Sequence, residues 1–414
     1  MTDDFLKKLM VSKAIMDKTT DGGGSTSSRN SRPESMVQEF DMPQAKYNIP
    51  QEFLQEQPST GQGQQPYLSE LPRVNTKPVG NPSVDAIKNS KLPDDIKRLM
   101  MEHPIQQPTM GMGTNTVLSN ELVEKAKSIN TKTMVVACAA DEHVLEAVEM
   151  ARLNNIIEGI LVGKETDIVS ILKELNIDSS NYEIINEEDN QKACELSVKL
   201  VSSNKADFLM KGLVDTSIIL RAALNKEYGL RTENRISHVS VLEVPTHDKL
   251  ILMSDGAMNI APNLDEKRQI IENSVKIAHS IGNTTPKVGV IGAIEKLNPQ
   301  MEATVHAIEL KEMNKNNIIT GCIVGGPFAL DNAINKEAAL HKGVTDPIAG
   351  DVDILIMPRI EAGNVFYKTM MFLAGAKGAS VIAGAQKPIV LTSRADSTES
   401  KFYSIALSAL VANL

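Results

Sequence analysis

From about residue 133 onward, short apolar runs alternate with longer segments whose apolar residues recur every three to four positions. Residues 133–139 predict a strand, 141–153 a helix and 159–163 a second strand. Strand, helix and strand in this order are typical of βαβ units, which build parallel sheets covered by helices on both faces. The folded part of the chain is therefore expected to begin as a doubly wound α/β unit.

The same alternation continues to the C-terminus. Further helices are predicted over residues 166–175, 189–203, 217–225, 265–281, 300–314, 362–373 and 402–414. Further strands are predicted over residues 208–210, 238–244, 250–253, 287–291, 321–324, 353–357, 379–383 and 388–391. Because 414 residues exceed what one small domain requires, two α/β units with separate cores are expected.

Composition narrows the classes of function. Trp is absent and aromatic residues make up only 3% of the chain, so aliphatic residues, Met and Ala must fill the cores. The formal net charge of -9 argues against a nucleic-acid-binding protein, because such binding depends on clustered Lys and Arg. No apolar run approaches the roughly 18 residues of a membrane span. A soluble protein that binds neither nucleic acid nor membranes is expected.

The cysteines indicate the redox environment. Cys138, Cys194 and Cys322 are far apart in sequence and show neither a CxxC motif nor metal-ligand spacing. Each lies in an apolar or helical context, which favours buried, reduced thiols. A cytoplasmic location is therefore expected.

Residues 1–112 differ in character from the rest. They contain a Gly- and Ser-rich linker at 22–28 and a stretch rich in Gln, Pro, Ser and Asn, with too few apolar residues to offset the entropy of ordering. Two short amphipathic helices are predicted, over 3–17 and 93–103. This region is expected to be a disordered N-terminal extension that could bind a protein partner.

Three polar stretches follow predicted strands. The first is LTSRADS, which places Ser393, Arg394 and Asp396 between the strand at 388–391 and the last helix. At the carboxyl end of a strand, free helix amides and an arginine form an anion site. The alternative is an ordinary helix cap with a surface arginine.

The second stretch follows the strand at 208–210. Gly212 allows close backbone approach, Lys211 and Arg221 carry positive charge, and Thr216 opens the next helix. Such groups can bind phosphate oxygens, although the P-loop spacing is missing. A solvated basic helix face is the alternative.

The third stretch, SDGAMNIAP, follows the strand at 250–253. It places Asp255 and Asn259 where a strand end meets the ligand crevice of an α/β sheet. The alternative is an Asx turn.

These motifs together resemble one family. From about residue 113 to 414 the chain resembles the phosphate acetyl/butyryltransferase family through MKGLVDTSIILRAALN, SHVSVLEV, MSDGAMNIAPN, GPFALDNA, PRIEAGNVFYK and VLTSRADS, in this order. MKGLV and VLTSRADS are more similar to the butyryl subgroup than to the acetyl forms. The resemblance implies reversible acyl transfer between coenzyme A and phosphate, without a metal or redox cofactor, by a homo-oligomer.

The resemblance also implies an architecture. Two doubly wound α/β domains with a cleft between them, similar to isocitrate dehydrogenase, would comprise residues 113–262 with 383–414, and residues 263–382. The C-terminal segment would return to the first domain, so Ser393 would face Arg221 across the cleft.

Roles for individual residues follow from the resemblance and from the chemistry. Ser393 would donate a hydrogen bond to the carbonyl or thiolate, while Arg394 and Arg221 would bind phosphoryl oxygens. A thiol with a pKa near 8.5 needs a base. The family's aspartate, seven residues after the serine, corresponds to Ser400 here, so Glu399 is the preferred base and Asp396 the alternative.

Other chemistry is less well supported. His238, His247 and His341 fit no Ser/His/Asp arrangement, so an acyl-enzyme is not expected. A dehydrogenase of the same architecture would need a cluster of metal-binding aspartates, and Asp331 and Asp351 lack that setting. A phosphate acetyltransferase remains an alternative, as does a non-catalytic scaffold whose N-terminal extension binds a partner.

Overall fold

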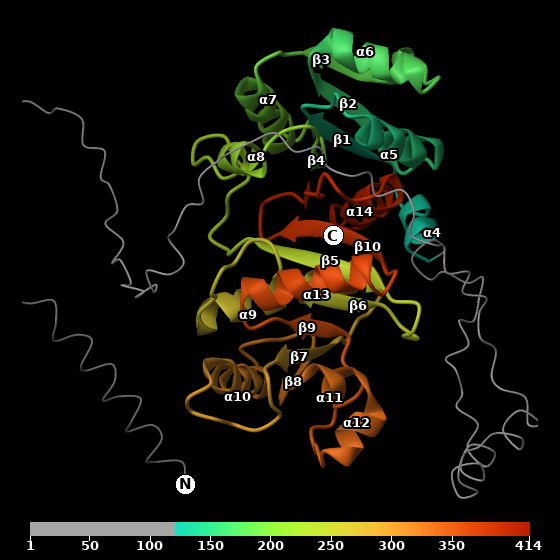
Figure 1. Ribbon diagram of the computed structural model, residues 1–414. Helices are drawn as coiled ribbons and strands as arrows, with labels where there is room; N and C mark the ends of the chain where they lie inside the picture. Colours follow the sequence, from blue (N-terminus) through green and yellow to red (C-terminus); the bar gives the residue numbers. More distant parts are fainter. Residues whose placement is uncertain (1–120) are drawn as a thin grey trace, which may run out of the picture. The chain divides into compact units, whose positions relative to one another are not determined.

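The structure, a computed structural model, describes residues 121–414. The helices predicted over 3–17 and 93–103, and the predicted disorder of residues 1–112, lie outside the described residues. Within 121–414 the chain alternates between strands and helices almost throughout, which confirms an α/β fold (Figure 1).

The elements follow the predicted order closely. The strands are β1 (Lys132–Ala137), β2 (Ile157–Gly163), β3 (Glu183–Asn186), β4 (Phe208–Lys211), β5 (Ser237–Glu243), β6 (Ile251–Ser254), β7 (Lys287–Ile291), β8 (Ile323–Phe328), β9 (Ile354–Ile356), β10 (Lys377–Ala383) and β11 (Ile389–Val390). The helices are α4 (Val123–Lys127), α5 (Glu142–Leu153), α6 (Glu165–Glu174), α7 (Asn190–Ser202), α8 (Thr216–Ala223), α9 (Leu264–Ser280), α10 (Glu302–Lys315), α11 (Leu330–Ile334), α12 (Lys336–His341), α13 (Ile360–Phe372) and α14 (Thr398–Val411). A 3-10 turn, η3 (Ser179–Asn181), precedes β3.

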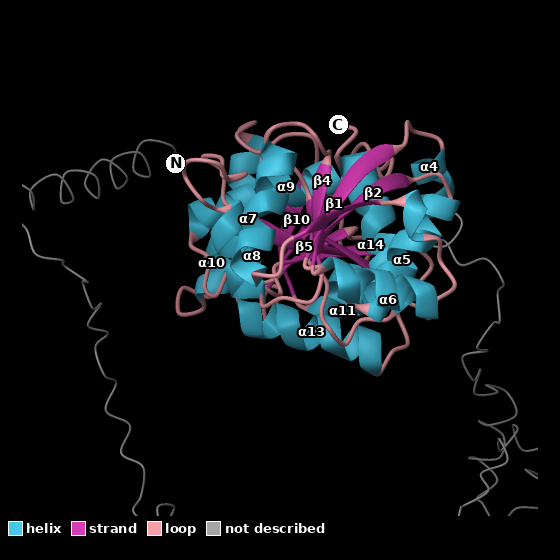
Figure 2. Ribbon diagram, turned by 90° about the horizontal axis from the view of Figure 1, so that it is seen from above, coloured by secondary structure: helices cyan, strands magenta, loops and turns pink. Residues whose placement is uncertain are grey.

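The described strands form one sheet of 11 strands in the order β3-β2-β1-β4-β11-β10-β5-β6-β9-β7-β8. Neighbours are parallel on both sides of the centre, but β10 runs antiparallel to β11 and β5, and β5 runs antiparallel to β6. The sheet is therefore mixed, whereas the βαβ pattern predicted a parallel one. Helices lie on both sides of the central strands (Figure 2).

One face of the sheet is covered by a continuous apolar core. Val136 of β1, Val241 of β5 and Ile354 of β9 belong to it, together with residues of α5, α9, α10 and α14. Alternate strand residues point the other way, because successive side chains of a strand face opposite sides. On that second face the apolar residues form two separate cores, one beneath α7 and α8 and one beside α11 and α13.

Helix α14 fixes the end of the chain against the first face. Its residues from Ser400 to Leu410 are all buried, and it packs on β10 and α5. Ser397 caps the start of the helix, and its side chain accepts a hydrogen bond from the backbone N–H of Ser400 at 3.1 Å. This cap satisfies one free N–H of the first turn and sets the point at which the preceding loop leaves the sheet.

Candidate active site

A cavity of about 270 Å³ lies where the two cores of the second face separate. Thr216 at the start of α8 and Tyr367 on α13 both line it, so its walls come from both sides of the gap. Other lining residues are His238, Ser380, Ser393 and Asp396. Residues from six separate parts of the chain thus surround one small polar space.

Polar residues of the two central strands lie beneath this cavity. Along β5, His238 and Ser240 are buried and alternate with Val239 and Val241, which face the continuous core. The Ser240 and Ser380 hydroxyls lie 2.9 Å apart, and Nδ1 of His238 lies 3.5 Å from Ser240 Oγ. Between the two apolar cores, this face of the sheet carries hydroxyl and imidazole groups in place of apolar side chains.

The loop after β11 forms a tight turn at the cavity. The backbone N–H of Ser393 donates to Oδ2 of Asp396 at 2.7 Å, and the N–H of Ala395 donates to Ser393 Oγ at 3.3 Å. The buried Lys401 of α14 donates to the carbonyl oxygen of Asp396. These bonds hold Ser393 and Asp396 together at the cavity, as the strand-to-helix junction predicted.

Arg394 points from the same loop toward α8. Its Nη2 donates to Oδ1 of Asp215 at 2.8 Å, and both side chains are more than 60% exposed. Arg394 does not line the cavity itself. Because a salt bridge this exposed contributes little stability, an anionic ligand can replace Asp215 as the partner of Arg394 at small cost.

The loop after β4 is built by close backbone packing. A Cβ at Gly212 would lie 2.2 Å from the carbonyl oxygen of Cys138, so glycine is required for β4 to end beside β1. Lys211 is buried and donates to the carbonyl oxygens of Gly212 and Val214, at 3.2 and 3.3 Å. Burial lowers the pKa of Lys211, and the nearby Arg394 acts in the same direction. Neither Lys211 nor Gly212 lines the cavity.

Arg221 lies on the exposed side of α8, one turn beyond Thr216. Within residues 121–414 it forms no ion pair, and it does not line the cavity. Its guanidinium is therefore available to a ligand, while its predicted position opposite Ser393 stays a prediction.

Asp255 holds the third predicted loop in place. The buried carboxylate accepts four hydrogen bonds: from the backbone N–H groups of His238, Ala257 and Met258, and from the side chain of Asn259. Their lengths lie between 2.7 and 3.0 Å. The Asx turn considered from sequence is thus present, and Gly256 and Ala257, not Asp255 or Asn259, form the cavity wall.

Glu399 lies outside the cavity. Tyr403 donates to its carboxylate at 2.6 Å, and Lys377 Nζ lies 3.1 Å from the same oxygen. The Tyr403 hydrogen bond, and then Lys377, lower the pKa of Glu399. A carboxylate held in this way is a poorer proton acceptor, so the geometry does not support the preferred base of the sequence interpretation.

The cavity contains groups that sequence reasoning did not select. His238 was considered and set aside, whereas Tyr367 and Lys368 were noticed only as part of a motif. Burial, and then the Asp396 carboxylate, raise the pKa of Tyr367 to about 12. The alternation of His238 and Ser240 with valines was the available signal, because polar residues on a buried strand face indicate a site.

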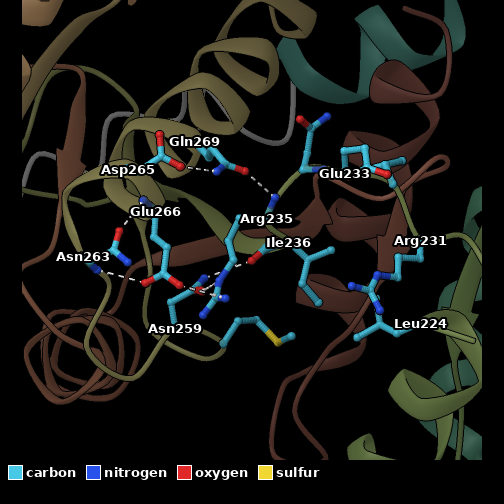
Figure 3. A pocket seen from close by; sticks show the side chains of 13 residues that line it. Leu224, Arg231, Glu233, Arg235, Ile236, Asn259, Asn263, Asp265, Glu266 and Gln269 are labelled. Atoms are coloured by element: carbon cyan, nitrogen blue, oxygen red, sulfur yellow. Dashed lines mark hydrogen bonds and ion pairs between the residues drawn. The ribbon is translucent and has the colours of Figure 1, made fainter. Parts of the chain in front are cut away.

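A larger cavity of about 570 Å³ is lined by Met258 and Asn259 of the Asp255–Asn259 loop and by residues at the start of α9 (Figure 3). Arg235, one of the charged residues that line it, pairs with Glu266 at 2.9 Å, and its Nε donates to Asn259 at 2.6 Å. Glu266 also completes the capping box of α9 with Asn263. Because these contacts serve the loop and the helix end, the smaller cavity is the better candidate site.

Residues 121–414 contain no cluster of three or more His, Cys, Asp or Glu side chains arranged to hold a metal ion. In the same range, every helix is too short or too polar to span a membrane.

Comparison with known proteins identifies relatives of nearly all of the described region. A family model described as phosphate acetyl/butaryl transferase matches residues 117–198 and 191–409. A phosphate butyryltransferase of Clostridium acetobutylicum is 50% identical over 293 residues, covering 71% of this chain and 97% of the relative. A phosphate acetyltransferase of Thermotoga maritima is 47% identical over 292 residues, covering 70% and 99%.

A solved structure is also similar to this chain. The crystal structure of a branched-chain phosphotransacylase from Enterococcus faecalis V583 shares 33% identity with a TM-score of 0.61, covering 68% of this chain and 99% of that one. The sequence of residues 117–409 and the fold of the described residues therefore match proteins of one kind.

Proposed function

The chain belongs to the phosphate acetyl/butyryltransferase family, and we propose that it transfers a butyryl or similarly short acyl group between coenzyme A and phosphate at the cavity beside β11. The reaction is reversible: acyl-CoA and phosphate give acyl phosphate and free coenzyme A. The assignment of the site rests on the turn from Ser393 to Asp396. This turn borders a polar cavity whose walls come from both of the proposed domains.

The proposed roles divide between the turn and α8. Ser393 donates a hydrogen bond to the acyl carbonyl oxygen or the thiolate, and Arg394 and Arg221 bind phosphate oxygens. Support comes from the weak, exposed pairing of Arg394 with Asp215 and from the exposed position of Arg221 on α8. Cationic donors aimed at developing negative charge are an effective source of catalysis. Lys211 and Asp255 act indirectly, because their hydrogen bonds to backbone groups fix the loops beside the cavity.

The two carboxylates considered as bases differ in position. Asp396 lines the cavity, while Glu399 is bound by Tyr403 and Lys377. Of the two carboxylates, Asp396 is therefore the one that faces a substrate bound in the cavity.

The proposal also includes the division into domains and the oligomeric state. The domain division into 113–262 with 383–414, and 263–382, is supported by the cavity, which takes Thr216 from one segment and Tyr367 from the other. A homo-oligomer is supported by α13, an apolar helix with Gly363 as its one buried residue and with Phe372 65% and Leu373 83% exposed. Exposed patches of this kind mark protein contacts.

The remaining expectations rest on chemistry. Acyl transfer between a thiol and phosphate moves no electrons between redox states, so no redox cofactor is needed. Three free cysteines support a reducing, cytoplasmic location. A protein partner of residues 1–112 stays a prediction.

The test is a thiol-release assay with butyryl-CoA and acetyl-CoA, each with and without phosphate. Release that depends on phosphate and is faster with butyryl-CoA is the expected result. Discrimination by a methylene group is worth about 1–3 kcal/mol, so the two rates should differ measurably. Faster release from acetyl-CoA would make the protein an acetyltransferase, and release without phosphate would indicate a thioesterase instead.

A further inference from the structure

His238 is the imidazole among the residues that line the candidate site. It is the second residue of β5, and its side chain is 7% exposed. Its backbone N–H donates to Asp255 at 3.0 Å, which fixes the start of the strand beside the Asp255–Asn259 loop. The ring meets Tyr367 edge to face, with the centroids 6.3 Å apart. The Asp255 carboxylate thus fixes the backbone of His238, and Tyr367 of α13 packs against the imidazole at the cavity.

The hydrogen bonding of the ring leaves one nitrogen free. Nδ1 lies 3.5 Å from Ser240 Oγ, which in turn lies 2.9 Å from Ser380 Oγ. Across the part of the chain that the structure describes, Nε2 has no hydrogen-bond partner. A neutral imidazole whose Nδ1 carries the proton presents Nε2 as an acceptor.

The groups around His238 favour the neutral form of its imidazole before the reaction. Burial lowers the pKa of His238, while the carboxylates of Asp255 and Asp396 act in the opposite direction. Lys368 and Tyr367 are the other ionisable side chains at the cavity. A neutral base adds no negative charge beside an anionic phosphate, which a carboxylate would do, and the two carboxylates stabilise the imidazolium once it forms.

We propose that His238 is a catalytic residue that takes the proton from the thiol of coenzyme A and returns it to the departing phosphate. This inference rests on the proposed function. In the direction of acyl-CoA formation, the S–H proton moves to Nε2 and the sulfur electron pair forms the bond to the acyl carbon. The bond from that carbon to the phosphate oxygen breaks, its electron pair stays on the oxygen, and the imidazolium proton follows.

In the reverse direction His238 takes a proton from phosphate as phosphate attacks the thioester, and then protonates the departing thiolate. Asp396 acts on the imidazolium by charge, and Ser240 helps to fix the ring. This assignment explains why a histidine and two serines interrupt the apolar face of the central strands.

The test is the pH dependence of kcat for His238→Gln, with His247→Gln as the matched control. His247 is also partly buried with a pKa lowered by burial, but it lies in the turn after β5 and outside the cavity. His238→Gln should lower kcat by about 10²- to 10⁴-fold and remove the acid limb of the profile, since general-base catalysis is worth about that much. His247→Gln should retain the wild-type profile.

Added imidazole separates a chemical role from a structural one. His238→Gly should regain activity in proportion to the concentration of imidazole, which loss of packing alone would not allow. If these variants fail to fold, diethyl pyrocarbonate on the wild-type enzyme decides: loss of activity should follow modification of His238, and acyl phosphate should protect it. Modification of His238 without loss of activity, or a folded His238→Gln variant with an unchanged pH profile, overturns the proposal. A wild-type chain without phosphate-dependent thiol release overturns the proposed function as well.

Discussion

Glu399 and Asp396 are three residues apart in sequence but lie in different surroundings. Asp396 accepts the N–H of Ser393 inside the turn and lines the cavity. Glu399, in the first turn of α14, instead meets Tyr403 one turn further along and Lys377 at the start of β10. The turn and the cap at Ser397 decide which of the two carboxylates lines the cavity.

Glu399→Gln should therefore change stability more than catalysis. Because the folded-state pKa of Glu399 is lowered, its contribution is present above the unfolded value of about 4.5 and is lost as pH falls through the folded value. The side chain is about half exposed, so the loss at pH 7 should be about 1 kcal/mol or less. Urea denaturation at pH 7 and pH 4 measures it, and kcat should stay within about twofold. A large fall in kcat with the fold intact would restore Glu399 as the base.

Helix α13 depends on one glycine. A Cβ at Gly363 would lie 2.2 Å from the carbonyl oxygen of Asp255, so the helix approaches the Asp255–Asn259 loop as closely as glycine permits. The helical turn that follows Gly363 carries Asn364, Tyr367 and Lys368 to the cavity. The helix and the loop are thus one packed unit beside the site.

Gly363→Ala should displace α13 and weaken both fold and activity. Overpacking of this kind costs about 1–3 kcal/mol, and the cavity should lose its Tyr367 wall. Gly292→Ala is the matched control, because a Cβ there would have its nearest neighbours at 3.6 Å. Denaturation midpoints and kcat of the two variants give the comparison. Equal behaviour of both would show that the close approach is not needed.

A cluster of charged side chains joins the N-terminal ends of three strands. Lys249 contacts Asp351 and Asp353 at 2.9 and 2.6 Å, and Lys287 also pairs with Asp351. These residues flank or begin β6, β7 and β9. Hydrogen bonds from Lys287 and Lys249 hold the pKa of Asp351 well below its usual range.

Asp351→Asn should make stability less sensitive to acid. With a lowered folded-state pKa, the wild-type contribution is present above the unfolded value of about 3.8 and disappears as pH falls below it. The wild type should therefore lose more stability than the variant between pH 5 and pH 2.5, as measured by urea denaturation. Parallel curves for the two proteins would show that Asp351 contributes no pH-dependent stability.

At the level of elements, local pattern predicted most helices and strands but not how the strands pair. Periodicity identifies β5, β6 and β10 correctly, yet it carries no information about direction, so the antiparallel centre was missed. The five-residue α11, the six-residue α12 and the four-residue β3 are too short to show a period. Cys138 and Cys194, 56 positions apart, lie with their sulfur atoms 4.0 Å from each other, a contact that spacing alone does not reveal.

For the whole molecule, the family match leaves residues 1–116 outside. Removal of residues 1–112 should leave kcat and KM unchanged within about twofold, because every residue that lines the cavity lies beyond Gly212. Steady-state kinetics of the full chain and the shortened chain measure this. A collapse in activity, with the same denaturation midpoint, would make the N-terminal extension part of the enzyme.

The central claim is that acyl transfer takes place at the Ser393–Asp396 turn. The most direct measurement is kcat for phosphate-dependent release of coenzyme A by Ser393→Ala, beside Ser170→Ala on the exposed face of α6 as control. Loss of one hydrogen bond to the reacting carbonyl or thiolate predicts a fall of about 10²- to 10³-fold for Ser393→Ala alone. Equal, wild-type kcat in both folded variants would contradict the claim and place the reaction elsewhere.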